Sequence, residues 1–590
     1  MTCFGREELL DRIVRRALDL KAGYRQNLAL VGPPLIGKSS VLLRSLELLK
    51  QSPPLLPVYI ELRAEASVAE FAEQFASTLL YRYWSAQGRE APQTFEALYA
   101  LCHPYLPQTT ELLALSITKA RRGLASALTL LFEAPGRLRQ ESGRLCVIML
   151  DEFHRLAAWE KAGSLTALGQ QVVVQKETMY LLASSSVDDA RRILQERLAL
   201  LFGHFEVIAV GPFDLATGVR FLADHAGLAA LGPAALIVLA DLTEGHPFYL
   251  ECVAQAVKAA GPTDGAASST LLSSEVPRSG ASSDRSFDRF RIVASEVEPR
   301  LGAALEALLF RPTGVLAQQC REAVERIPVG RRAACLPILL AVANGHHRVS
   351  AIAVATGRPP REVARAVRTL AAAELVVRRG VFCCIVHRLL RFWLIASYQI
   401  QHGPVHLDPL AGRQAFTAAV RQLLDQSTAR APQTVLETVA ELMRRFQNEL
   451  VEIRGRRLRL PKLDVHTLLL PGIPRAVVGR RDAGPWFCVP YTTLVREGDA
   501  VALVQTLRHV SKPWRRRIVI ALAGVEINAK LLLQEQRFWV WDLGELNDLL
   551  ELYGVPCLLP TELQEVAAVM TVPPVSGAET PSAEGQEASA

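Results

Sequence analysis

A phosphate-binding pattern lies near the start of the sequence. The segment Gly32-Pro-Pro-Leu-Ile-Gly-Lys-Ser39 has the spacing G-x-x-x-x-G-K-[ST], follows the apolar run Asn27–Val31 and opens a segment of helical periodicity, Ser39–Leu49. In such a loop, backbone N–H groups and a helix N-terminus attract phosphate oxygens, while the lysine reaches the β and γ phosphates and the hydroxyl binds Mg²⁺. We therefore expect a nucleotide-binding loop formed by Gly32, Pro33, Pro34, Leu35, Ile36, Gly37, Lys38, Ser39 and Ser40.

Two adjacent carboxylates complete the pattern further along the chain. Asp151 and Glu152 follow the apolar run Leu145–Leu150, as expected for acids at the end of a buried strand. Phosphate transfer needs an acid that binds the metal and a base that takes a proton from water. We expect Asp151 and Ser39 to hold Mg²⁺ and Glu152 to act as the general base. Lys38 and Glu152 are thus the predicted catalytic residues for ATP hydrolysis.

A third apolar run, Tyr180–Ala183, ends in the hydroxyls of Ser184, Ser185 and Ser186. This place suits a residue that lies between the two motifs and senses the γ-phosphate. We assign Ser185 to that role, and an ordinary turn of serines is the alternative. Three arginines that could stabilise the transferred phosphate follow this run. We favour Arg197 for this role, and the alternative is that each is a solvated helix residue. They are Arg191, Arg192 and Arg197.

The elements that position these side chains are buried strands separated by helices. Short apolar runs alternate with helical patterns in this part of the chain, which predicts a parallel sheet covered by helices on both faces. The predicted fold class is therefore α/β, with a P-loop ATPase core over residues 1–212. The expected strands are Asn27–Val31, Pro57–Leu62, Leu145–Leu150, Tyr180–Ala183 and Phe205–Val210.

Beyond Gly211-Pro212 the strands stop and helical periodicity continues. We expect a helical lid domain at 213–260, a flexible insertion rich in Gly, Ser, Thr, Asp and Pro at 261–288, and a helical and winged-helix domain at 289–400. The winged helix is predicted from three helices followed by two short strands around Gly380. The helices are Cys335–Asn344, Ser350–Ala355 and Arg361–Glu374.

The last of these helices has two different faces. An apolar stripe with helical spacing is expected to pack against the domain, and it consists of Val363, Val367 and Leu370. A basic stripe with the same spacing lies on another face, and it consists of Arg361, Arg365 and Arg368. We expect these arginines to contact DNA phosphates or guanine edges. The alternative is a domain that docks on the ATPase core, with its arginines solvated or paired internally.

Together these motifs resemble the STAND and archaeal-type ATPases, relatives of AAA+ proteins within the P-loop class. The resemblance covers about residues 3–400 and is carried by two further segments. Phe4-Gly5-Arg6-Glu7-Glu8 is similar to the N-terminal motif that lies against adenine, and Gly245-His246-Pro247-Phe248 is similar to the Gly-x-Pro element of the lid. The resemblance implies that Gly5, Arg6 and Pro247 contact the nucleotide.

One segment departs from the pattern of this group. Val386–Trp393 resembles the end of the winged-helix domain, but archaeal-type relatives often carry Asp-Pro where this chain has His387-Arg388. His387 is therefore either a switch-locking histidine, as the resemblance to STAND proteins implies, or a satisfied core histidine.

Residues 405–560 have the helix-strand-strand-strand-helix-strand order of restriction-endonuclease-like folds, which archaeal-type ATPases frequently carry. Such a nuclease needs an Asp on one strand and Glu-x-Lys on the next. Asp464 fits the first position. We expect it to face residues Val489–Thr492 of the next strand, and that strand has neither Glu nor Lys. We expect an inactive module unless Glu497 or Asp499 supplies a carboxylate. Its basic residues either bind a phosphate backbone or only make the protein soluble. They are Arg454, Arg456, Arg457, Arg459, Lys462, Lys512, Arg515, Arg516 and Arg517.

Composition and charge narrow the functional classes. Of the 590 residues, 50% are hydrophobic and 21% charged, which indicates a globular chain, and a net charge of +7 is too small for a histone-like or coat protein. We find no apolar stretch of membrane-helix length, no export signal at the start and no Cys-x-x-Cys pair among ten cysteines. We expect a cytoplasmic protein without membrane contact, ending in a disordered tail at 572–590.

The sequence predicts an ATP-binding and ATP-hydrolysing molecular switch. Its nucleotide state would reposition the winged-helix and C-terminal domains, in a bacterial defence, signalling or DNA-associated system. The expected ligands are ATP or ADP with Mg²⁺, and the candidate partners are DNA, a protein, or further copies in a nucleotide-dependent homo-oligomer. The alternative is a DNA-binding regulator or adaptor in which ATP is a structural ligand. An active nuclease is disfavoured by the missing Glu-x-Lys.

Overall fold

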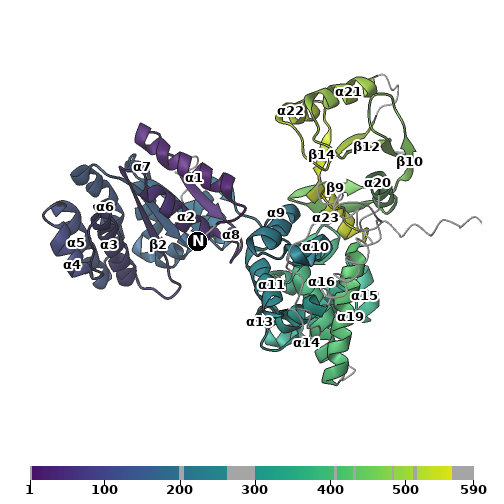
Figure 1. Ribbon diagram of the computed structural model, residues 1–590, viewed down its shortest axis with the longest axis horizontal. Coiled ribbons are helices and arrows are strands. Elements are labelled where there is room, and N and C mark those ends of the chain that lie inside the picture. Colours follow the sequence, from purple (N-terminus) through teal and green to yellow (C-terminus); the bar gives the residue numbers. More distant parts are fainter. Residues whose placement is uncertain are drawn as a thin grey trace, which may run out of the picture. The chain divides into compact units, whose positions relative to one another are not determined.

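The computed structural model describes residues 3–197, 205–261, 299–403, 408–428, 434–480, 484–508 and 514–560. The chain forms two compact units (Figure 1). The first consists of residues 1–213 with the short segment His246–Phe248, and the second consists of 214–245 and the chain from Tyr249 onwards. The insertion expected beyond Gly261 and the tail at 572–590 lie outside the described residues. No helix within the described ranges is long and apolar enough to cross a membrane.

The first unit contains a five-stranded sheet in which every neighbouring pair is parallel. The predicted parallel α/β core is therefore confirmed, with strand ends within two residues of the expected ones. The spatial order places β4 between β1 and β3, so the run that ends in serines lies between the strands of the two main motifs. The order is β2 (Leu55–Glu61), β3 (Leu145–Asp151), β4 (Met179–Ser184), β1 (Asn27–Val31) and β5 (Phe205–Ala209).

Helices cover both faces of this sheet (Figure 1). Leu28 and Leu30 of β1 pack toward α1 (Glu7–Asp19) and α2 (Lys38–Lys50). Ala29 and Val31 point into the opposite core. Because alternate residues are buried on opposite sides, the strands read as continuous apolar runs. The opposite core is built by α3 (Val68–Ser85), α4 (Phe95–Cys102), α5 (Pro107–Arg121), α6 (Ser126–Ser142) and α7 (Ser164–Val174).

The second unit begins with helices. The elements between residues 329 and 385 follow the predicted order of three helices and a hairpin, with Gly357 and Gly380 at positive φ where the chain turns. The hairpin is antiparallel. The elements of this part are α9 (Leu215–Arg220), α10 (Pro233–Leu242), α11 (Pro247–Ala259), α13 (Val315–Glu325), α14 (Val329–Ala343), α15 (Val349–Thr356), α16 (Pro360–Ala372), β6 (Val376–Arg379), β7 (Phe382–Ile385), α17 (Arg388–Trp393), α18 (Gln399–His402) and α19 (Pro409–Thr428).

The C-terminal part of this unit carries a mixed five-stranded sheet. The first three strands are antiparallel and the last three are parallel to one another. A separate hairpin, β8 (Glu449–Ile453) with β9 (Arg456–Leu460), precedes the sheet. The sheet order is β10 (Asp464–Leu468), β11 (Ala476–Arg480), β12 (Trp486–Tyr491), β13 (Arg516–Ala521) and β14 (Trp539–Asp542). Its helices are α20 (Val435–Arg444), α21 (Glu497–Arg508), α22 (Ile527–Glu535) and α23 (Leu543–Leu552).

The expected neighbour of Asp464 is wrong. Asp464 pairs with Arg480 of β11, and β11 then pairs with β12, so Asp464 does not face Val489–Thr492. The strand β11 was missed because it offers only Ala-Val-Val before a glycine and an arginine, too short an apolar run to be distinguished from a loop. The strand β8 was missed for a similar reason, since two of its five residues are glutamates.

Candidate active site

The phosphate-binding loop connects β1 to α2 through an unusual backbone. Leu35 and Gly37 have φ angles of 59° and 96°, and Gly37 immediately precedes α2. A Cβ atom at Gly32 would lie 2.1 Å from the carbonyl oxygen of Val210, so only glycine fits there. The N–H of Gly32 donates to the carbonyl of Ser184 at 3.3 Å, which ties the loop to the end of β4. No side chain among the described residues caps α2, so its N-terminus presents N–H donors suited to phosphate.

The side chains of the loop have different surroundings. Ser39 and Ser40, in the first turn of α2, are exposed, as are Pro33, Pro34 and Leu35. Ile36 is fully buried and packs in the core with α1 and α2. We infer that Ile36 anchors the loop through its side chain, and that any contact it makes with phosphate comes from its backbone.

Lys38 folds back over the loop. Its Nζ donates to the carbonyl oxygens of Gly32 at 2.9 Å and Pro33 at 2.7 Å, and only 3% of the residue is exposed. Burial lowers the pKa of Lys38, and the nearby carboxylates of Glu152 and Asp151 oppose that shift. A buried ammonium beside two acids is suited to bind phosphate oxygens that replace the carbonyls.

Asp151 is fixed at the end of β3. It is 1% exposed, its Oδ2 accepts a hydrogen bond from the Tyr59 hydroxyl at 2.9 Å, and its Oδ1 accepts from the N–H of Glu152 at 3.0 Å. Burial, followed by the charge of Asp151, raises the pKa of Tyr59, so the phenol stays protonated as a donor. Sequence reasoning missed Tyr59, although a tyrosine within the apolar strand Pro57–Leu62 was its signal.

Glu152 is held against the end of β4. Its backbone φ of 55° is uncommon for a residue with a side chain. Its Oε2 accepts hydrogen bonds from the N–H of Ser185 at 3.0 Å and from the Ser185 hydroxyl at 2.7 Å. The structure therefore brings together two residues, Glu152 and Ser185, that were predicted separately.

His154 joins this group and was not predicted. Its Nδ1 lies 3.2 Å from Oε2 of Glu152 and 3.0 Å from the hydroxyl of Ser184. Burial lowers the pKa of His154, and Glu152 opposes the shift. Glu152 thus has two neighbours, Ser185 and a predominantly neutral imidazole, that fix the direction of its carboxylate.

The N-terminal motif ties α1 to the chain after β5. The Arg6 guanidinium donates to the carbonyl of Gly211 and lies 4.8 Å from the centre of the Phe213 ring. Burial lowers the pKa of Arg6, and Gly5 has a φ of 65°. Pro247 starts α11, and its segment belongs to the first unit. The adenine contact of these residues stays a prediction.

The arginines after β4 stay unassigned. Arg192 is paired with Asp189, Arg191 is exposed, and the side chain of Arg197 lies outside the described residues. In the second unit, His387 Nδ1 lies 3.5 Å from Glu244, and 46% of its side chain is exposed. A side chain this exposed excludes the alternative that His387 is a buried core histidine with its hydrogen bonds satisfied.

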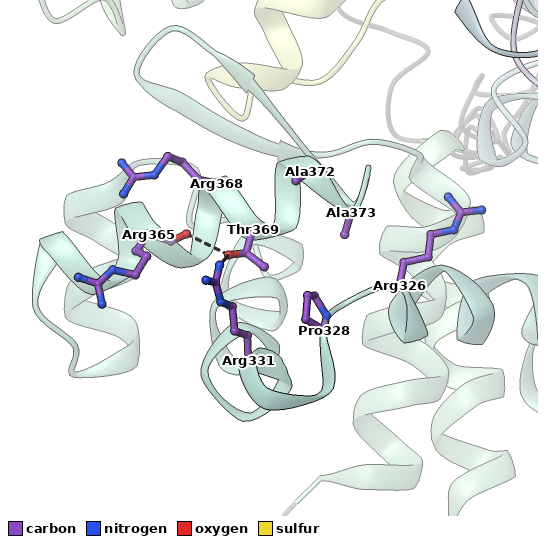
Figure 2. Close-up of a pocket in the computed structure, with 8 residues that line it drawn as sticks. All are labelled: Arg326, Pro328, Arg331, Arg365, Arg368, Thr369, Ala372 and Ala373. Atoms are coloured by element: carbon purple, nitrogen blue, oxygen red, sulfur yellow. Dashed lines mark hydrogen bonds between the residues drawn. The ribbon is translucent and has the colours of Figure 1, made fainter. Parts of the chain in front are cut away.

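The two faces of α16 differ as expected. Each residue of its apolar stripe is at most 1% exposed, and its basic stripe of Arg361, Arg365 and Arg368 is exposed. Arg365 and Arg368 also line a pocket (Figure 2). The predicted DNA contact of this face stays a prediction.

The described residues of the C-terminal sheet and its helices include no comparable group of carboxylates. Asp464 is exposed on β10. Glu497 accepts from the Asn528 amide at 3.1 Å, and Asp499 accepts from the N–H of Arg496 at 2.9 Å at the start of α21. Throughout the described ranges, no cluster of three or more His, Cys, Asp or Glu side chains is arranged to hold a metal ion.

Comparison with known proteins identifies the first part of the chain. Residues 2–182 match the family model of the AAA ATPase domain. The chain thus carries a P-loop ATPase domain, and the match supports nucleotide binding and hydrolysis by it. None of the curated proteins matches the chain.

Several solved structures are similar to the chain at low identity. The Walker-type ATPase paby2304 of Pyrococcus abyssi is 17% identical with a TM-score of 0.42, and the match covers 66% of this chain and 96% of that one. The ORC2 protein of Aeropyrum pernix is 12% identical with a TM-score of 0.38, covering 72% and 95%. The ORC1 protein of the same organism, in complex with DNA, is 16% identical with a TM-score of 0.31, covering 72% and 95%. TM-scores this low carry no conclusion about function.

Proposed function

We propose that the chain is an ATP-hydrolysing molecular switch. The observation that carries the proposal is Glu152 at the carboxyl end of β3, directly after the buried Asp151. Glu152 is hydrogen-bonded to Ser185, which follows β4, the neighbour of the strand β1 that leads into the phosphate-binding loop. The nucleotide state changes the arrangement of a winged-helix domain and a C-terminal module. The setting is a bacterial defence, signalling or DNA-associated system in the cytoplasm, as the resemblance to STAND and archaeal-type ATPases implies.

The residues of the site fit ATP and Mg²⁺. The uncapped N-terminus of α2 and Lys38 suit phosphate, and the hydroxyl of Ser39 with the carboxylate of Asp151 is an oxygen donor set of the kind that Mg²⁺ prefers. When bound, the metal neutralises charge on the β and γ phosphates. Tyr59 keeps the Asp151 carboxylate oriented, because it occupies Oδ2 with a protonated phenol.

Glu152 acts as the base that takes a proton from the attacking water. Its carboxylate is engaged with the N–H and hydroxyl of Ser185, so Ser185 sets where that base points. A base held by a hydroxyl next to the phosphate loop can change partner when a γ-phosphate engages the serine. Ser185 would therefore link the identity of the nucleotide to the position of Glu152.

The switch is tested by comparing two nucleotide states of the full chain. We expect the solution mass, or the retention of DNA, to differ between ADP and a slowly hydrolysed ATP analogue. The Lys38→Ala protein is the control, since it should give one result with both nucleotides. Identical mass and identical DNA retention in the two states of the wild-type protein would contradict the switch.

A DNA-binding regulator with ATP as a structural ligand is the second candidate. It is favoured by the exposed arginine stripe of α16, which follows the turn at Gly357 and precedes the hairpin β6–β7 in the order of a winged helix. Turnover separates the two candidates, because a regulator of this kind would lose nothing when Glu152 is replaced by Gln. The C-terminal module is proposed to be an inactive relative of restriction endonucleases that binds a backbone without cutting it.

A further inference from the structure

A pocket of about 410 Å³ lies in the second unit beside the C-terminal half of α16 (Figure 2). Two of its arginines, Arg365 and Arg368, belong to the predicted basic stripe. Two others were not predicted: Arg326, which follows α13, and Arg331, in the first turn of α14. The four arginines belong to three helical segments that line the same pocket.

The positive charge of this pocket is poorly compensated. None of the described residues that line it is an Asp or a Glu. Arg326 pairs with Glu374 at 3.3 Å, but the two side chains are 59% and 80% exposed, and such surface pairs contribute little. In the described part of the chain, the other three arginines have no ion pair within 4.0 Å, whereas Arg388 contacts three acids. A pocket lined by three arginines without an ion pair and a fourth with an exposed one is suited to an anion.

Arg331 is held in place at the wall of the pocket. Its Nη1 donates to the hydroxyl of Thr369 at 3.1 Å, and that hydroxyl lies 3.4 Å from the carbonyl of Arg365 (Figure 2). The guanidinium therefore rests against α16 and keeps further N–H donors for a ligand. Pro328, which also lines the pocket, immediately precedes the 15-residue helix α14, so a helix N-terminus adds positive potential at the same place.

We propose that this pocket binds a backbone phosphate of DNA, with Arg326 and Arg331 extending the contact surface of α16. Arg361, Arg365 and Arg368 follow each other at one-turn spacing along roughly 10 Å of helix and lead into the pocket. A row of cations that ends in a pocket matches the repeated charges of a nucleic acid strand better than a single small anion. The inference rests on the proposed DNA-binding function and adds residues from α13 and α14 to it.

The test measures binding of a fluorescent DNA duplex to the full chain between 50 and 200 mM salt. Replacing both Arg326 and Arg331 by Gln should weaken binding equally for unrelated sequences and reduce the slope of log affinity against log salt by about one, since the pocket takes one phosphate and each phosphate contact contributes about 0.9. The matched control replaces Arg121 and Arg137 by Gln, which removes the same charge from exposed side chains of the first unit. Arg331→Lys should keep most of the slope, because it keeps the charge.

Three outcomes would overturn the proposal, and each has a different meaning. If the Arg326/Arg331 variant matches the control while Arg361, Arg365 and Arg368 variants lose binding, DNA binding stands and the pocket assignment fails. If the wild-type chain retains no DNA at any salt, both fail. The third outcome is that DNA does not bind, while pyrophosphate raises the thermal stability of the Lys38→Ala protein and no longer does so once Arg331→Gln is added to it. The pocket would then be a site for a small anion and not for a DNA backbone.

Discussion

In the first unit, the parallel strand β3 ends in Asp151, with Glu152 directly after it, whereas in the C-terminal module the parallel strand β14 ends in Asp542. Asp151 is 1% exposed and its partners are a phenol and a backbone N–H. The Asp542 side chain is 56% exposed, pairs with Arg454 at 2.9 Å, and accepts from the N–H of Glu545 at 2.7 Å as the cap of α23.

The same position in an α/β sheet thus serves two purposes. A carboxylate that is buried, held by uncharged donors and placed beside a phosphate loop has no cationic side-chain partner of its own among the described residues and can bind a metal. A carboxylate that is exposed and already neutralised by an arginine stabilises a helix. The surroundings of the acid, and not its place at a strand end, distinguish the candidate active site from a structural cap.

The largest expected effect comes from the phosphate loop. Lys38→Ala should abolish ATP binding or hydrolysis, because it removes the ammonium that lies over the loop and beside both acids. Nucleotide affinity, measured by titration with a fluorescent analogue, is the readout. Replacement of Lys530 by Ala in the C-terminal module is the control. A Lys38→Ala protein with wild-type nucleotide affinity would contradict the nucleotide-binding role of the phosphate loop.

The basic stripe should show a large effect of another kind. A contact surface of several cations loses on the order of 10³-fold in DNA affinity between 50 and 200 mM salt, and replacing Arg361, Arg365 and Arg368 together by Ala should reduce the logarithmic slope by about three. If the variant keeps the wild-type slope, the DNA contact surface lies in the C-terminal module or does not exist.

Tyr59→Phe tests whether the phenol orients the Asp151 carboxylate. It removes the donor to Oδ2 and keeps the ring, so the Mg²⁺ concentration needed for half-maximal hydrolysis should rise about 10–100-fold, as for other residues that orient a metal ligand. Nucleotide affinity without metal should stay unchanged. An unchanged Mg²⁺ requirement would show that Tyr59 does not position this carboxylate.

Asp542→Ala should have a smaller effect on stability and none on turnover. Loss of an N-terminal cap costs about 1 kcal/mol, which denaturant unfolding followed by tryptophan fluorescence can measure, since Trp539 and Trp541 lie in the same strand. Asp542→Asn should retain most of that stability. Reduced ATP turnover in Asp542→Ala would contradict the structural role assigned to this acid.

The smallest expected effect is the absence of DNA cleavage. With Mg²⁺ or Mn²⁺, and with or without ATP, the purified chain should leave a supercoiled plasmid intact, because a metal nuclease needs converging carboxylates and Asp464 pairs with Arg480 in the sheet. Metal-dependent nicking that disappears in Asp464→Ala would restore the nuclease interpretation.

The parts that the sequence predicts are those with strong local patterns. The strands of the first unit are long apolar runs, so Asp151 and Glu152 could be placed at a strand end, and the faces of α16 followed from helical spacing. The strands β8 and β11 are short and partly polar, and no local pattern marks them. Tyr59, His154 and the pair Arg326 and Arg331 depend on contacts between distant segments, which only the folded chain brings together.

Steady-state ATP hydrolysis by the wild-type and Glu152→Gln proteins tests whether Glu152 is the base of an ATPase. Glutamine keeps the size of the side chain and an oxygen that can accept from Ser185, but it cannot take a proton from water. We expect wild-type nucleotide affinity with turnover reduced by about 10²–10⁴-fold. Equal hydrolysis by the two proteins would contradict it.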